Sequence, residues 1–413
     1  EVQLSSLHGR KIAIDASMAI YQFLIAVRSG GPNHASAMLT NAEGETTSHI
    51  QGLFNRTIRF LTEGIRPVYV FDGKPPSFKS GELQKRRERR EKAETSLKAA
   101  LEEGNIEEQD KQSKRLVRAG QKENDDCIKL LTLMGVPVVR APCEAEAQAS
   151  AMAKAGLVYA VGTEDMDALT FQAPVLLRKM TFANASKSEI QTMNYEKAIE
   201  GLGLTHDQFV DLCILLGCDY CDTIRGVGPK TALKLIRDHK CIEEILKNLD
   251  DKKKEGIPDS WIPNEIRKRE KKKKEEDGYD TEEENNRVKK NESEDEDDNE
   301  QVPVYVEARK LFKNHEVITE GLNLKWEPCK AEELTAFLVD DMGFNAERVR
   351  SNIEKLNKAV QASAKPQLRM ENFFKPKANP ISSEKTAAKR KVEETKNKDS
   401  KKGKAASGFK KRR

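Results

Sequence analysis

The sequence has no long apolar run. Among its 413 residues no stretch of about 18 apolar residues occurs, and no charged segment followed by an apolar one opens the chain. The sequence therefore predicts neither a membrane-spanning helix nor a secretory signal. Aromatic residues are also few, at 6%, whereas 34% of the residues are charged. The length is sufficient for a buried core and predicts roughly two or three structural units.

Cysteine and histidine are scarce and scattered. The seven cysteines and six histidines show no spacing typical of a zinc site. The six histidines also give no indication of an active site based on imidazole. Cys218 and Cys221 form a C-x-x-C pair, but Asp219 lies between them and no second pair follows. We interpret the cysteines as reduced, half-buried thiols of a nuclear or cytosolic protein, with a metal or redox role as the alternative. The sequence also has neither a Ser–His–Asp grouping nor a P-loop.

Charged residues are abundant and segregated. Lys and Arg number 72 against 68 Asp and Glu, a net charge of +4. The tail from Lys375 to Arg413 alone carries 15 basic and four acidic residues, a net charge of +11. Clustered positive charge predicts a polyanionic partner such as nucleic acid, or a nuclear-import signal.

Short β-rich segments alternate with helical patterns. The predicted strands are KIAID, PVYVFD, VPVVR, LVYAVG and PVLLR, at residues 11–15, 67–72, 136–140, 157–162 and 174–178. Helical patterns such as SMAIYQFLIAV and HIQGLFNRTIRFLTEG lie between them. This alternation predicts an α/β fold with a mainly parallel sheet flanked by helices.

Acidic residues follow several of the predicted strands. The candidates are Asp15, Asp72, Glu144, Glu146, Asp165, Asp167 and Asp219. Each of them alone could cap a helix. Because ligands of such sheets bind at the carboxyl ends of the strands, we expect the acids to converge there, where only cations would relieve their repulsion. Carboxylates suit Mg²⁺ or Mn²⁺, and a two-ion site would stabilise both oxygens of a phosphodiester in hydrolysis. The sequence therefore predicts a metal-dependent enzyme that acts on a polyanion.

Two long, highly charged helices are predicted within residues 78–135, in SGELQKRRERREKAETSLKAALEEG and EEQDKQSKRLVRAGQKENDDCIKLLTLMG. A helix that is polar nearly all round projects into solvent or binds a charged partner. Basic residues gather at the start of the first helix, where their charges oppose the helix dipole. They are Lys79, Lys85, Arg86, Arg87, Arg89 and Arg90. We interpret the pair as an anion-binding element, with a solvated helical hairpin as the alternative.

Two further segments have the composition of disordered chain. Residues 267–301 contain 10 basic and 15 acidic residues and almost nothing to bury. The chain after about residue 364 is again of low complexity. We predict a disordered insertion and a disordered C-terminal tail.

Six long motifs indicate a family. They are KIAIDASMAIYQFLIAVR, EGETTSHIQGLFNRTIRF, PVYVFDGKPPSFKSGELQKRRERR, APCEAEAQA, VGTEDMDALTF and FVDLCILLGCDYCDTIRGVGPKTALKLI. They closely resemble the flap endonucleases, which are structure-specific 5′ nucleases, and the resemblance covers residues 9–265 and 303–375. It implies a 5′ flap endonuclease and 5′-3′ exonuclease that cleaves DNA by two-metal hydrolysis, in Okazaki fragment maturation and base-excision repair.

The resemblance also implies an organisation along the chain. Its segments would be the N-terminal half of the nuclease core (1–77), a helical arch (78–135), the internal half of the core with a helix-hairpin-helix element (136–265), a charged insertion (266–302), the C-terminal part of the core (303–364) and a basic tail (365–413).

The resemblance assigns the acids and two basic residues to the reaction. It implies that two Mg²⁺ ions, or Mn²⁺ in their place, are bound by Asp15, Asp72, Glu144, Glu146, Asp165, Asp167 and Asp219. Glu144 and Glu146 are expected in the first turn of one helix, on different faces of it. Lys79 and Arg86, at the base of the arch, would contact the scissile phosphate as it gains charge.

Further residues are implied to hold DNA. Tyr21 would stack on a base near the cut, and Arg28 and Arg56 would contact the substrate or the cleaved strand. Gly226 and Gly228 precede the helix PKTALKLIRDH, as in the helix-hairpin-helix element of the family, where a K⁺ ion bridges the loop to duplex DNA.

The segment QLRMENFF, at residues 367–374, resembles a sliding-clamp box. Gln367, Met370, Phe373 and Phe374 would bind the trimeric clamp, proliferating cell nuclear antigen, with the chain itself a monomer. The basic groups at residues 389–391 and 410–413 are interpreted as nuclear-import signals or as DNA contacts. The expected location is the nucleus, including nucleolus and nucleoplasm, with the mitochondrion as a further compartment.

Two features depart from the family pattern. Fewer residues precede the first strand than in relatives, and the insertion at 267–301, with Thr281 and Ser293 as candidate phosphorylation sites, is foreign to the pattern. An alternative reading is therefore a catalytically weak protein that binds DNA junctions and the sliding clamp. A third is a junction resolvase or excision-repair nuclease of the same superfamily.

Overall fold

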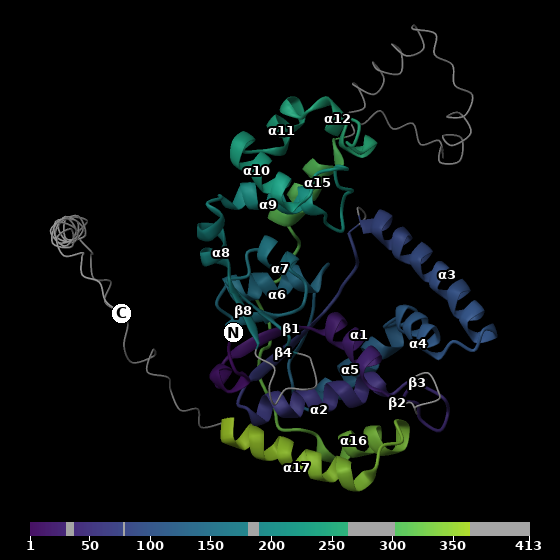
Figure 1. The fold of residues 1–413 in the computed structure, drawn as a ribbon. Coiled ribbons are helices and arrows are strands. Elements are labelled where there is room, and N and C mark those ends of the chain that lie inside the picture. The colour runs from purple at the N-terminus through teal and green to yellow at the C-terminus, as the bar shows by residue number, and fades with distance from the viewer. Residues whose placement is uncertain (30–36, 77–78, 181–189, 263–301, 364–413) are drawn as a thin grey trace, which may run out of the picture. The chain divides into compact units, whose positions relative to one another are not determined.

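The computed structural model describes residues 1–29, 37–76, 79–180, 190–262 and 302–363 (Figure 1). The chain forms two units, Glu1–Lys365 and Pro366–Arg413, and every described residue belongs to the first. None of the described helices is both long and apolar enough to cross a membrane. The predicted insertion at 267–301, the C-terminal tail and the sliding-clamp box lie outside the described residues.

A six-stranded sheet forms the centre of the unit, in the order β5-β4-β1-β6-β7-β8. The strands are β1 (Lys11–Asp15), β4 (Arg66–Phe71), β5 (Val138–Arg140), β6 (Ala160–Gly162), β7 (Val175–Arg178) and β8 (Gln191–Asn194). The first five are parallel, and β8 pairs antiparallel with β7. The predicted mainly parallel sheet is confirmed. The edge strand β8 was not predicted, because its sequence QTMN is polar and short.

Successive apolar side chains of the strands point to opposite faces of the sheet, and both faces are buried. Ile12 and Ile14 of β1 belong to one apolar cluster, whereas Ala13 between them belongs to another. The first cluster contains residues of α1 (Ala16–Ala26), α2 (Ser48–Thr62) and α5 (Gln121–Leu133), and the second contains residues of α6 (Ala145–Lys154) and α7 (Asp167–Thr170). Figure 1 shows these helices on opposite sides of the strands. Apolar side chains on both faces are typical of parallel sheets between helical layers.

A third apolar cluster contains residues of helices and of the turns between them, and among the described residues none of the six strands of the sheet contributes to it. It unites α9 (His206–Leu216), α10 (Pro229–His239), α11 (Ile242–Asn248) and α15 (Val304–Lys313). A partly buried ion-pair network joins α9, α11 and α15: Arg309 Nε donates to Asp211 Oδ1 at 2.7 Å, and Arg309 NH1 donates to Glu243 Oε1 at 2.7 Å. The network therefore joins α15 to helices that precede it by many residues.

The helices α3 (Ser80–Glu102) and α4 (Ile106–Arg115) form a charged hairpin. Most of α3 is exposed, and it buries mainly Ala93 and Ala100. The second predicted long helix is wrong in one respect: it is divided into α4 and α5. Gly120 is the N-cap residue of α5 and donates its backbone N–H to Glu123 Oε2, and α5 then packs into the core through residues such as Leu130.

The remaining elements complete the unit. They are the 3₁₀ turn η1 (Leu4–Leu7), the paired strands β2 (Arg28–Ser29) and β3 (Ala37–Met38), α8 (Tyr195–Leu202), α12 (Asp251–Lys254), the 3₁₀ turn η3 (Asp259–Trp261), α16 (Ala331–Ala336), the π-helical turn η4 (Phe337–Asp341) and α17 (Ala346–Ser363).

Candidate active site

Two acids are brought together by neighbouring strands. Asp15 is the last residue of β1 and caps α1, accepting a hydrogen bond from the Met18 backbone N–H at 3.0 Å. Asp72 directly follows β4, which pairs in parallel with β1. Because parallel strands end at the same edge, their terminal carboxylates point into one crevice.

The next strand supplies two more acids. Asp165 and Asp167 follow β6, and Asp165 Oδ1 accepts a hydrogen bond from the Asp167 backbone N–H at 2.9 Å. Thr163 links this turn to β1, because its hydroxyl donates to Asp15 Oδ2 at 2.9 Å. The same hydroxyl accepts from the Asp165 backbone N–H at 3.1 Å. Thr163 therefore fixes the two strand ends relative to each other.

Glu144 and Glu146 lie at the start of α6. Glu144 is its N-cap residue and Glu146 is in the first turn. The backbone N–H of Ala145, between them, donates to Asp72 Oδ1 at 2.9 Å, which holds this helix end against β4. The two glutamates have different neighbours: Glu144 contacts Lys79 and Tyr220, whereas the charges of Asp15 and Asp72 act on Glu146.

Burial and mutual repulsion disfavour the charged forms of three of these acids. Burial, together with the charge of Asp72, raises the pKa of Asp15 to about 7. Burial, together with Asp15 and Asp72, raises the pKa of Glu146 to about 9. Burial, followed by the charges of Asp165 and Asp219, raises the pKa of Asp167 to about 7. Without a cation, the surroundings of the cluster therefore favour protonation of these three carboxyl groups near neutral pH.

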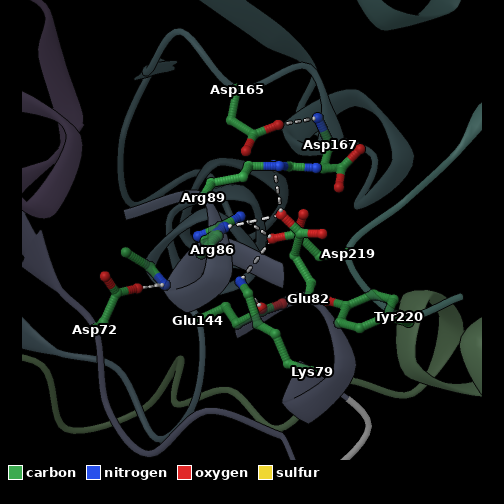
Figure 2. A network of polar contacts seen from close by, with 11 residues as sticks. Asp72, Lys79, Glu82, Arg86, Arg89, Glu144, Asp165, Asp167, Asp219 and Tyr220 are labelled. Atoms are coloured by element: carbon green, nitrogen blue, oxygen red, sulfur yellow. Dashed lines mark hydrogen bonds and ion pairs between the residues drawn. The ribbon is translucent and has the colours of Figure 1, made fainter. Parts of the chain in front are cut away.

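Two basic residues from the hairpin end reach the same cluster (Figure 2). Lys79 Nζ lies 2.6 Å from Glu144 Oε1 and 3.1 Å from Asp219 Oδ2. Arg86 NH2 donates to Asp219 Oδ2 at 2.8 Å. Burial alone would lower the pKa of Lys79, but Glu144 and Asp219 raise it above its ordinary value. The structure therefore brings both predicted basic residues to the predicted acids.

An open cavity of about 1120 Å³ contains this site. Six of the seven predicted acids line it: Asp15, Asp72, Glu144, Glu146, Asp165 and Asp219. Asp167 lines the adjoining cavity of about 480 Å³ instead. Basic residues at the start of α3 and around the end of α4 line the same cavity: Lys79, Arg86, Arg89, Arg90, Arg115 and Arg118. Acids and bases thus share one open cavity, in which Lys79 and Arg86 contact the acids directly.

The acids fit a hard divalent cation in charge and ligand type. All of the donors are carboxylate oxygens, which Mg²⁺ and Mn²⁺ prefer, and three of these groups have pKa values that a cation would lower. Within the described residues, no three His, Cys, Asp or Glu side chains already enclose a single point as a metal site. In the arrangement shown, the ammonium of Lys79 provides the positive charge between Glu144 and Asp219.

The predicted DNA-binding residues have different surroundings. Tyr21 is 40% exposed and lines the cavity near Asp15. Arg56, on α2, is only 8% exposed and is outside the set of described residues that line this cavity. Arg28 lies in β2, and its side chain is outside the described part of the chain. The roles of Arg28 and Arg56 stay predictions.

Gly226 and Gly228 precede α10 as predicted. Gly226 has a left-handed φ of +79°, which favours glycine, and Gly228 is the N-cap residue of the helix. A Cβ atom added at Gly228 would meet no other atom within 4 Å. Gly228, Pro229 and Lys230 are exposed, so the start of this helix is accessible to a phosphate, although Pro229 itself has no N–H to donate.

The thiols of the C-x-x-C pair, Cys218 and Cys221, are free and half-buried as predicted, and they lie 3.5 Å apart in the turn that carries Asp219 and Tyr220. Two hydroxyls of the site were missed in the sequence. Tyr220 donates its hydroxyl hydrogen to Glu144 Oε2, and Thr163 binds Asp15. The only signal for these two residues was their position beside predicted acids. No local pattern distinguishes a hydroxyl that binds a carboxylate from one that faces solvent.

Comparisons with known proteins agree with this arrangement. Residues 1–93 match the model of the XPG N-terminal domain, and residues 135–219 match that of the XPG I-region. The chain is 66% identical to flap endonuclease 1 of Phaeodactylum tricornutum over 396 residues, which cover 96% of this chain and 92% of that protein.

Solved structures show the same fold. Flap endonuclease-1 from Methanococcus jannaschii matches with a TM-score of 0.60 and 31% identity, covering 87% of this chain and 96% of that one. The catalytic core of Rad2 in complex with a DNA substrate matches with a TM-score of 0.57 and 25% identity, covering 86% and 95%. With its strand-end acids facing a basic hairpin, and with relatives over nearly its whole length, the chain belongs to the flap endonuclease family.

Proposed function

We propose that this chain is a structure-specific 5′ flap endonuclease, with 5′-3′ exonuclease activity at the same site, that hydrolyses DNA phosphodiester bonds with bound Mg²⁺. The observation that carries the proposal is a single cavity in which strand-end acids face the basic side of α3. Membership of the flap endonuclease family supports it.

The acids would hold two Mg²⁺ ions, with Mn²⁺ as a substitute. Bound ions of this kind lower the pKa of water and neutralise charge on the phosphate. Asp15, Glu146 and Asp167 would give up their protons on binding the cations, because their raised pKa values reflect burial and repulsion that a cation relieves.

Lys79 and Arg86 would exchange one anion for another. In the described arrangement both contact Asp219, and Lys79 also contacts Glu144. A phosphate in the cavity would compete with these carboxylates for Lys79 and Arg86. Cations would then bind the carboxylates that the two basic side chains release. Donors positioned in this way stabilise the charge that develops on the scissile phosphate.

Two other parts of the chain would hold the DNA. The basic side of α3 would bind the single-stranded flap, with Tyr21 stacking on a base near the cut. The exposed start of α10 would bind a duplex phosphate, with a K⁺ ion bridging the two.

The cellular role is also a proposal. We place the activity in Okazaki fragment maturation and base-excision repair in the nucleus, with the sliding clamp bound through the box at residues 367–374, outside the described residues. When Phe373 and Phe374 are both changed to alanine, we expect the clamp no longer to pull down the protein. Cleavage of free flap DNA should be retained.

Cleavage of a double-flap DNA tests the proposal. With Mg²⁺ the protein should release the intact flap, and it should cut the matching duplex without a flap far more slowly. EDTA, or Asp165→Asn, should prevent release while flap binding persists. If wild type and Asp165→Asn bind the flap alike and neither cuts it, the reading as a junction-binding protein replaces this one.

A further inference from the structure

We infer that Tyr220 is a positioning residue for the reaction, because its phenol holds the Glu144 carboxylate in place when Lys79 turns away to the DNA. This inference rests on the proposed function, and it concerns a residue outside the acids and bases that the family resemblance assigns.

Glu144 is held in an unusual way for a residue at a helix start. It is the N-cap residue of α6, yet its side chain makes no hydrogen bond to the amides of its own helix. Instead Oε1 accepts from Lys79 Nζ at 2.6 Å, and Oε2 accepts from the Tyr220 hydroxyl. Only 8% of Glu144 is exposed, so these two donors determine where its carboxylate points.

The two donors are anchored differently. The Lys79 ammonium lies on a long, flexible side chain, is shared with Asp219, and lines the cavity that would receive DNA. Tyr220 is 6% exposed, and its ring packs edge-on against Phe312 with centroids 5.0 Å apart. Phe312 in turn lies 5.3 Å from Phe171, inside the third apolar cluster. A phosphate can therefore withdraw Lys79, whereas the apolar packing keeps Tyr220 in position.

The consequence concerns the carboxylate that a metal ion would meet. Without the phenol, and with Lys79 on a phosphate, the Glu144 carboxylate would lose both of its hydrogen-bond donors and could rotate toward the amides of its own helix. Partners that orient a ligating carboxylate typically contribute about 10- to 100-fold in metal affinity or activity. The same factor is expected for Tyr220, acting through Glu144.

Tyr220→Phe tests the inference, since it keeps the ring and removes only the hydroxyl. The matched control is Tyr305→Phe, a tyrosine of the same apolar cluster that is 5% exposed and packs on Trp261. Single-turnover cleavage of flap DNA is measured across a Mg²⁺ titration. Independently of activity, the rise in melting temperature on adding Mg²⁺ is measured without DNA.

Tyr220→Phe should lower the cleavage rate, or raise the half-saturating Mg²⁺ concentration, by about tenfold or more. It should also reduce the Mg²⁺-induced rise in melting temperature, while flap affinity and the melting temperature in EDTA stay as in Tyr305→Phe. In a Glu144→Ala background, Tyr220→Phe should change neither Mg²⁺ readout further.

Three results would overturn the inference. They are a Mg²⁺ dependence of Tyr220→Phe equal to that of wild type, a loss that matches Tyr305→Phe, and a loss of the same size in the Glu144→Ala background. Failure of the proposed function looks different: wild type itself would not cut. The melting-temperature readout would then still report whether Tyr220 supports cation binding by Glu144.

Discussion

Asp15 stands at the end of a buried strand, whereas Arg86 reaches the same cavity from a helix that is exposed along most of its length. The acids are held by the sheet, by Thr163 and by backbone amides. The basic side chains are held mainly by the acids themselves. One wall of the cavity is therefore rigid before any ligand arrives, and the other can rearrange around the ligand.

The largest effect on cleavage is expected from a change to one of the acids at the strand ends. Asp165→Asn should lower the single-turnover rate of flap cleavage by roughly 10³-fold or more, because it removes a carboxylate that a cation needs. Flap affinity and the melting temperature in EDTA should change little, since the Asp165 side chain lies at the cavity and not in the core. Cleavage within tenfold of wild type would show that the acids are not the reaction centre.

Among the basic residues of the cavity, Arg86→Ala should lower the same single-turnover rate by roughly 10²-fold. This is the usual effect of removing one donor to a developing charge. The side chain is 47% exposed, so the stability in denaturant should stay near that of wild type. Arg87→Ala is the matched control, because Arg87 is 77% exposed on the same helix and pairs with Glu91. Equal losses in the two variants would mean that the basic residues of α3 act only through their total charge.

The pH dependence of the melting temperature should report on the acids of the cavity without any DNA. The raised pKa values of Asp15, Asp167 and Glu146 mean that their protonated forms stabilise the fold, fully below about pH 4. That stabilisation is lost as the pH rises through about 7 for the two aspartates and about 9 for Glu146. In EDTA the melting temperature should therefore fall between pH 6 and 9, and Mg²⁺ should reverse the fall.

Glu146→Gln sharpens the pH experiment. It removes the group with the highest of the three pKa values, so its melting temperature in EDTA should fall less steeply toward pH 9. It should also gain less from Mg²⁺. A slope equal to that of wild type would show that repulsion among these acids does not limit the stability of the metal-free protein.

The smallest effect is expected from the exposed ion pairs of α3. Arg87→Ala should change the free energy of unfolding by less than about 0.5 kcal/mol, because an exposed i,i+4 pair gains little over water. Urea denaturation measures the change. A loss above about 1 kcal/mol would mean that the hairpin depends on its surface charges for its fold.

Much of this molecule could be predicted from local patterns. Alternation along β1 and β4 and the acids at their ends depend only on neighbouring residues, and both appear in the structure where they were expected. The helix after Gly228 was also predictable, since Pro229 at its first position favours a helix start. The edge strand β8 and the division between α4 and α5 were not, because their sequences carry weak propensities that packing overrides.

The sequence by itself determined which residues are acidic at the strand ends and which helix is too charged to enter the core. Only the tertiary structure decided which charges meet. Lys79 and Glu144 are 65 residues apart, Tyr220 and Glu144 are 76 apart, and Arg309 and Asp211 are 98 apart. Propensity and periodicity act over a few residues, whereas these contacts depend on how whole helices pack onto the sheet. Local sequence patterns therefore identify the acids, whereas the residues that orient these acids can be identified only from the tertiary structure.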